Sequence, residues 1–184
     1  QYLPLLELSV KEAPEDDRNV HYLGREYFFY GRWDDCIATL QRHLAMPTAT
    51  WADERSASMR YIAKSYVRKG DILSARRYFL RAIAEAPHLR EGYMDLATVL
   101  YEQEDWPGVL YFTACALEII QTVPPSPERD QQLSLCYSMM GWAKYHEERL
   151  EESDQYFQQA LQLRRKTLPD ESPLIAWAYY NRAG

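Results

Sequence analysis

The fold is decided by residues 56–89, which read SASMRYIAKSYVRKGDILSARRYFLRAIAEAPHL. Apolar residues recur there at spacings of three and four, first as Met59, Ile62, Ala63 and Tyr66 and then as Ala75, Phe79, Ala82 and Ile83. This is the period of a helix with one buried face. Gly70 lies between the two sets and can adopt the left-handed conformation that ends a helix. The stretch therefore predicts two antiparallel helices joined by a tight turn.

The same pattern recurs before and after this stretch. Its small residue Ala63 corresponds to Gly24, Ala97 and Gly141, and its larger residue Phe79 corresponds to Leu40, Thr113 and Phe157. Small residues on one helix allow a second helix to approach closely. Two unrelated amphipathic helices would not keep this register, so the sequence predicts four repeated helical hairpins.

The composition of the chain agrees with an all-α fold. Only 7 of the 184 residues are glycine, and helix-forming Ala, Leu, Arg, Glu and Gln dominate. Hydrophobic residues make up 47%, far more than a disordered chain contains. No apolar run approaches the ~20 residues that cross a bilayer, so we expect no membrane span. The formal net charge of −6 argues against a general nucleic-acid binder.

The three cysteines point to a reducing environment. Cys36, Cys115 and Cys136 are an odd number, lie far apart and form no C-x-x-C pair. A disulfide framework or a zinc site would need paired spacing, so we expect buried free thiols. The first residues lack the basic segment and cleavage site of a signal peptide. These features predict a cytoplasmic protein.

The repeated residues resemble the tetratricopeptide repeat, whose pattern is W-x₂-L-G-x₂-Y…A-x₃-F…P with a 34-residue period. The unit at 56–89 matches nearly every position, with Met59 in place of Trp. The third unit lacks the turn glycine and the proline, and the fourth has its aromatic residue displaced to Tyr145. The resemblance implies a right-handed α-solenoid that acts as a scaffold and binds peptide segments or partner domains.

The repeat register divides the chain into four complete units with a partial unit at each end. We expect a helix of a preceding repeat at 1–16, repeats at 17–50, 56–89 and 90–123, a proline-rich connector at 124–133, a fourth repeat at 134–167 and a terminal helix at 168–184. Both ends fall inside repeats. We therefore expect the sequence to be part of a longer chain.

A narrower resemblance concerns residues 18–44, 51–63 and 81–97. They resemble repeats that accompany family 2 glycosyltransferases of bacteria. The resemblance implies that this segment is the accessory region of such an enzyme. An alternative is that the helical segment supplies part of the enzyme's acceptor-binding surface.

No motif of catalysis is present in the sequence. There is no D-x-D pair for a divalent ion and no glycine-rich phosphate loop. Asp16-Asp17 and Asp34-Asp35 are expected to cap helices, and the four histidines are scattered. We expect no catalytic residue, no cofactor-binding residue and no metal ligand, and therefore no enzymatic activity in this segment.

In tetratricopeptide repeats the first helix of each hairpin lines a concave groove. The corresponding candidate binding residues are His21, Arg25, Phe28, Arg60, Lys64, Arg68, Tyr101, Trp142 and Tyr145. Arg60, Lys64 and Arg68 are spaced four apart and form one stripe, which is either a solvated helix face or a site for an anionic ligand. Trp142 and Tyr145 either pack between hairpins or bind a partner. The expected partner is an acidic protein or peptide, or a catalytic domain of the same chain.

Overall fold

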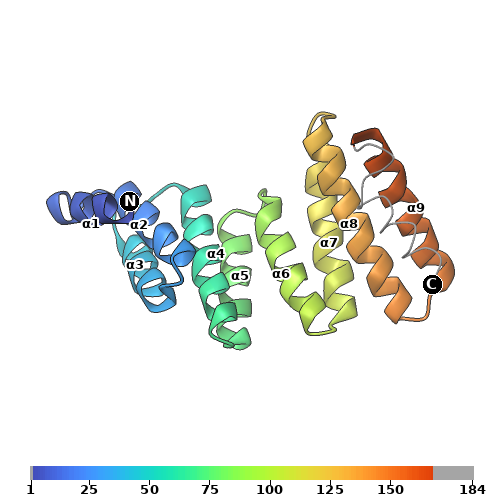
Figure 1. Cartoon of the computed structure of the whole chain (residues 1–184), viewed down its shortest axis with the longest axis horizontal. Coiled ribbons are helices and arrows are strands. Elements are labelled where there is room, and N and C mark those ends of the chain that lie inside the picture. Colours follow the sequence, from blue (N-terminus) through green and yellow to red (C-terminus); the bar gives the residue numbers. More distant parts are fainter. Residues whose placement is uncertain (1, 168–184) are drawn as a thin grey trace. The chain divides into compact units, whose positions relative to one another are not determined.

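The computed structural model describes residues 2–167, and every regular element in that range is a helix (Figure 1). The nine helices of this range are α1 (Leu3–Glu12), α2 (Asp17–Phe29), α3 (Trp33–Ala45), α4 (Ala52–Arg68), α5 (Ile72–Glu85), α6 (Arg90–Glu102), α7 (Trp106–Thr122), α8 (Pro127–His146) and α9 (Leu150–Thr167). The prediction of an all-α fold of helical hairpins is confirmed. The terminal helix expected at 168–184 lies outside the described residues.

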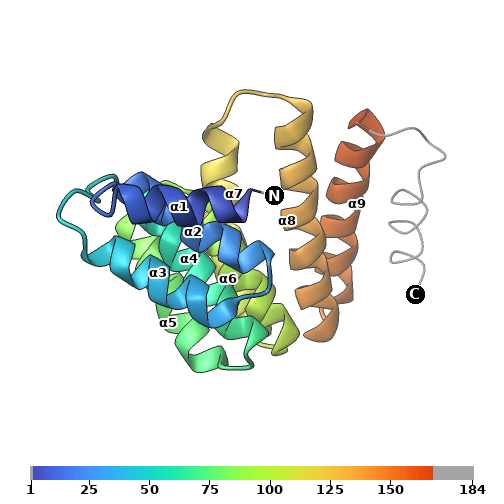
Figure 2. The ribbon, with the colours of Figure 1, turned by 60° about the vertical axis from the view of Figure 1, so that its left-hand side comes forward.

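Consecutive helices form the hairpins. Helix α2 packs on α3, α4 on α5 and α8 on α9, and the last pair runs side by side in both views (Figures 1 and 2). The connector predicted at 124–133 is shorter than expected because α8 begins at Pro127. Ser126 starts this helix early, since its side chain accepts a hydrogen bond from the backbone N–H of Arg129. Proline is well suited to the position that follows such a cap.

The four hairpin turns share one backbone conformation. Gly31, Gly70, Glu104 and Glu148 hold equivalent places and have φ angles of 72°, 78°, 57° and 61°. In each turn the N–H of the next residue donates to a carbonyl five residues earlier at 2.9 Å, as Asp71 does to Tyr66. This is the Schellman arrangement at a helix C-terminus. The repeat therefore keeps its turn even where the sequence has glutamate in place of glycine.

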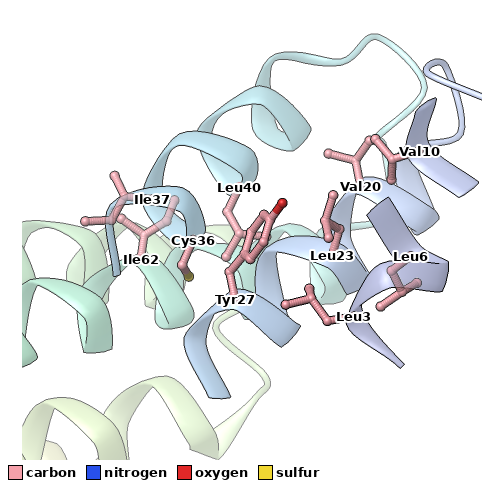
Figure 3. Close-up of a cluster of buried hydrophobic side chains, with 10 residues drawn as sticks. All are labelled: Leu3, Leu6, Val10, Val20, Leu23, Tyr27, Cys36, Ile37, Leu40 and Ile62. Carbon is pink, nitrogen blue, oxygen red and sulfur yellow. The ribbon is translucent and has the colours of Figure 1, made fainter. Parts of the chain in front are cut away.

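The chain divides between Gly92 and Tyr93 into two compact units. The core of the first unit is formed by apolar side chains from α1 to α4 (Figure 3), namely Leu3, Leu6, Val10, Val20, Leu23, Tyr27, Cys36, Ile37, Leu40 and Ile62. Helix α1 supplies three of these residues and packs on α2, as the second helix of a preceding repeat would. In the second unit, one core cluster joins α7 to α8 through Ala116, Ile120, Leu133 and Cys136.

All three cysteines are free, as predicted, although Cys115 is only half-buried. Burial raises the pKa of the Cys36 thiol to about 11, and it also raises the pKa of Cys115. Thiols with raised pKa values are poor nucleophiles and metal ligands. Among residues 2–167, no helix combines the length and the apolar character needed to cross a membrane.

Candidate functional site

Three basic residues of α4, the basic stripe, lie along one side of that helix. Arg60 and Lys64 are partly exposed, and Arg68 is exposed in the last turn. Because they are spaced by four residues, their side chains project from the same face. Lys64 Nζ lies 5.8 Å from the ring centroid of Tyr61, a cation–π distance. The basic stripe is therefore joined to an aromatic ring on its own helix.

Aromatic side chains of α2 and α4 continue this surface, because the two helices are in contact. The Tyr61 ring lies 5.5 Å from Phe28 and 5.9 Å from Phe29. Phe28 also packs on Trp33, whereas Phe29 is exposed. Tyr61 and Phe29 are not among the residues predicted for the groove, since neither occupies a groove position of the repeat pattern. We call Phe28, Phe29 and Tyr61 the aromatic patch.

Two other residues predicted for the groove have different surroundings. Arg25 lies 3.6 Å from Glu26 and 5.0 Å from the Tyr22 ring, so its charge already has one acidic and one aromatic neighbour. His21 is 5% exposed and thus does not face a groove. The expectation for His21 fails because α4 of the next hairpin covers it, and its Nδ1 lies 2.7 Å from Ser58 Oγ.

The Ser58 hydroxyl also lies 3.0 Å from His43 Nδ1, so it links two imidazoles. His43 Nε2 in turn lies 3.5 Å from Glu54 Oε1. Burial lowers the pKa of His21 to about 4, and burial is also the largest cause that lowers the pKa of His43. Both imidazoles are therefore neutral near pH 7. We call His21, Ser58, His43, Glu54 and the neighbouring Asp17 the buried polar network.

The side chains of the buried polar network contact one another in the order Ser58, His43, Glu54. This is the order of the nucleophile, base and carboxylate in a catalytic triad. Ser58 is, however, completely buried beneath the helices. A substrate carbonyl cannot reach its hydroxyl, so this serine joins helices and does not act as a nucleophile. Asp16, next to Asp17, caps α2 by accepting a hydrogen bond from the N–H of Asn19, as its sequence position predicted.

The predicted aromatic residues of the second unit pack against other aromatic side chains of that unit. Trp142 lies 5.7 Å from Tyr145 and 5.6 Å from Phe157. Tyr101 lies 5.4 Å from Trp106, and the Trp106 ring stacks on His146 at 4.2 Å. Packing between helices therefore accounts for Trp142, while Tyr145 at the end of α8 keeps an exposed edge.

A hollow of about 620 Å³ lies along α9 and is lined by Gln155, Gln158, Gln159, Leu161, Gln162, Arg165 and Lys166. The residues that line it are glutamine, leucine, arginine and lysine, with no carboxylate, histidine, serine or cysteine among them. Arg164 instead points toward α8, where it donates to Ser134 Oγ at 2.8 Å and to Ser138 Oγ at 2.9 Å. Burial lowers the pKa of Arg164. The polar groups between α8 and α9 thus stabilise the hairpin.

Residues 133–174 match the family model of the tetratricopeptide repeat. This part of the chain is therefore similar to a tetratricopeptide repeat. The match begins in α8, at the start of the fourth predicted unit, and its described part covers most of the α8–α9 hairpin. No curated protein matches the sequence.

Solved tetratricopeptide-like structures show the same fold over most of the chain. A MamA structure has a TM-score of 0.72 with 17% identity over 89% of this chain and 87% of MamA. BtubC (BKLC) from P. vanneervenii has a TM-score of 0.76 with 15% identity over 96% of this chain and 77% of BtubC. A structure of the nearly identical TPR-like repeats of a putative kinesin light chain from Podosopora anserina has a TM-score of 0.70. Its sequence is 19% identical over 92% of this chain and 84% of that chain. At these identities the likeness extends to the fold alone.

Proposed function

We propose that this chain is a non-catalytic interaction module that binds an extended acidic protein segment through α2 and α4. Repeats of this kind generally mediate protein–protein interaction. The observation that carries the proposal is the contact between the basic stripe and the aromatic patch through Tyr61. Carboxylates of a partner would face Arg60, Lys64 and Arg68, and an aromatic or apolar side chain would lie on Phe29.

The charge balance of the chain supports an acidic partner. The net charge is −6, so three basic residues along one side of a helix differ in sign from the molecule as a whole. A local field of this kind steers oppositely charged ligands and weakens with salt. Exposed aromatic rings add apolar contact area that ionic contacts lack. Together these features favour a segment that combines acidic residues with one aromatic anchor.

The test uses a fluorescent peptide of glutamate and aspartate residues that contains one tryptophan. We expect its affinity to fall by at least about tenfold in the Arg60→Glu/Arg68→Glu variant, and its salt dependence to decrease. The matched control is Arg76→Glu/Arg77→Glu, which changes the net charge equally at two exposed positions of α5. Equal affinities for the wild type and the basic-stripe variant at low salt would refute the proposal.

A more specific form of this proposal identifies the partner as a catalytic domain of the same chain. It rests on the resemblance of residues 18–44, 51–63 and 81–97 to repeats that accompany bacterial family 2 glycosyltransferases. The gene sequence on both sides of this segment tests it directly, since a neighbouring glycosyltransferase domain is required. The alternative, a contribution to the acceptor site, requires that basic-stripe variants change the acceptor KM of the complete enzyme. The free thiols Cys36 and Cys136 support a cytoplasmic setting.

A further inference from the structure

Three metal-binding side chains converge from three helices in the first unit. Asp17 comes from α2, His43 from α3 and Glu54 from α4, and one ligand atom of each lies within 4.8 Å of the other two. These residues are far apart in sequence, so no spacing motif identified them. Imidazole and carboxylate are the donors that Zn²⁺ accepts in proteins.

The imidazole of His43 provides a second, independent observation. The side chain is 0% exposed, and its Nε2 has no hydrogen-bond partner within residues 2–167. Buried ring nitrogens are normally hydrogen-bonded, so an unpartnered one calls for an explanation. The nitrogen faces Glu54 Oε1 across 3.5 Å, which exceeds the usual 2.7–3.2 Å of an N–H···O bond.

The same 3.5 Å separation suits two ligands of one ion. With Zn–N and Zn–O bonds of about 2.0–2.2 Å, neighbouring atoms of a tetrahedral site lie roughly 3.3–3.5 Å apart. Glu54 can supply Oε1 while its other oxygen, Oε2, stays near Arg18 Nε at 3.8 Å. Glu54 is 9% exposed and Asp17 is half-buried, so solvent can supply a fourth ligand from the Asp17 side.

The serine bridge can hold His43 in the required tautomer. If His43 Nδ1–H donates to Ser58 Oγ, the Ser58 hydroxyl donates to His21 Nδ1, and His43 Nε2 then carries the lone pair. Metal-bound histidines commonly donate their other ring N–H to a nearby acceptor in this way. If both hydrogen bonds of Ser58 ran in the opposite direction, His43 would carry its proton on Nε2. Glu54 is too distant from that nitrogen for a good hydrogen bond. Arg55, which lies nearby, forms an ion pair with Glu85, with 2.6 Å between Arg55 Nε and Glu85 Oε1.

We propose that Asp17, His43 and Glu54 bind one divalent transition-metal ion, with Zn²⁺ the best fit to one nitrogen and two carboxylate ligands. The ion joins the first hairpin to α4 of the second. Its role is structural, because its three ligands come from α2, α3 and α4 and the ion fastens these helices to one another. The site is independent of the basic stripe and of peptide binding.

The test measures Zn²⁺ binding to the whole chain by calorimetry after chelator treatment and dialysis, with Co²⁺ absorbance as a report of coordination geometry. We expect one ion per chain and a higher melting temperature with Zn²⁺. Asp17→Asn and Glu54→Gln keep the side-chain shapes and should each weaken binding by more than about 100-fold, whereas Ser58→Ala should cost about 10–100-fold. Circular dichroism establishes that each variant is folded.

The matched control is Asp53→Asn, since Asp53 precedes Glu54 and lies 3.0 Å from the exposed His88. This variant should bind Zn²⁺ as the wild type does. The proposal is overturned if the wild type binds no more tightly than about 1 mM, or if Asp17→Asn retains full affinity. It is also overturned if Asp53→Asn abolishes binding, because the surface pair would then be the site.

Discussion

Gly141 of α8 lies directly against the ring of Phe157 in α9. A Cβ atom added to Gly141 would be 2.8 Å from Phe157 Cε1, closer than real Cβ contacts allow. Gly24 faces Leu40 in the same way, at equivalent places in the first hairpin. The pairing of a small residue with a larger one, visible in the repeated sequence, is therefore a point of closest approach between two helices.

Gly141→Ala should lower the free energy of unfolding by about 1 kcal/mol. Alanine favours a helix by about 1 kcal/mol over glycine, but overpacking against Phe157 costs about 1–3 kcal/mol. Urea denaturation measures the difference. The double variant Gly141→Ala/Phe157→Leu should recover part of the loss, and a Gly141→Ala protein more stable than the wild type would contradict the close approach.

Phe79→Ala should lower the free energy of unfolding by about 3–5 kcal/mol, because the ring is 1% exposed and its loss leaves a cavity. Arg77 lies on the exposed face of the same helix. Arg77→Ala should therefore change stability by less than about 0.5 kcal/mol. Guanidinium denaturation of the two variants compares them, and equal losses would mean that the assigned core face of α5 is incorrect.

Acid should destabilise the first unit through His21. Burial, followed by the nearby charges of His43 and Arg25, lowers its pKa from 6.5 in the unfolded chain to about 4. The unfolded state thus binds more protons between these values, and stability is full above pH 6.5 and declines as the pH falls toward 4. The total effect is about 3 kcal/mol.

His21→Gln removes this titration and keeps a group that can hydrogen-bond to Ser58. Urea denaturation at pH 7 and pH 4.5, both with EDTA to exclude metal effects, should show a smaller loss of stability for this variant. Identical losses in the wild type and the variant would refute a depressed pKa at His21. An NMR titration of the His21 ring protons measures the pKa directly.

Cys115 should react with a thiol reagent before the other two cysteines do. Cys36 and Cys136 are buried, whereas Cys115 is half-buried. In the folded protein we expect Ellman's reagent to modify Cys115 slowly and to leave the other two thiols unmodified. All three should react in urea, and fast modification of Cys36 in the native protein would contradict the packing around it.

The hairpins, their turns and their buried faces could be predicted from the sequence because each depends on residues close together in the chain. Helical periodicity identified Phe79 as buried, and the position of Gly70 located a turn with positive φ. The structure has turns of the same conformation at Glu104 and Glu148, where the sequence offers no glycine. The basic stripe followed from spacing on one helix, since i and i+4 side chains share a face.

The environment of His21 and the meeting of Asp17, His43 and Glu54 were decided only by the tertiary structure. Within its own helix His21 occupies a position that the repeat pattern leaves outside the core, and α4 of the next hairpin buries it through Ser58. The three metal-binding side chains come from separate helices whose relative rotation depends on packing between hairpins. Local periodicity specifies which face of a helix is apolar, whereas contacts between hairpins determine which polar groups lose water and which partners replace it.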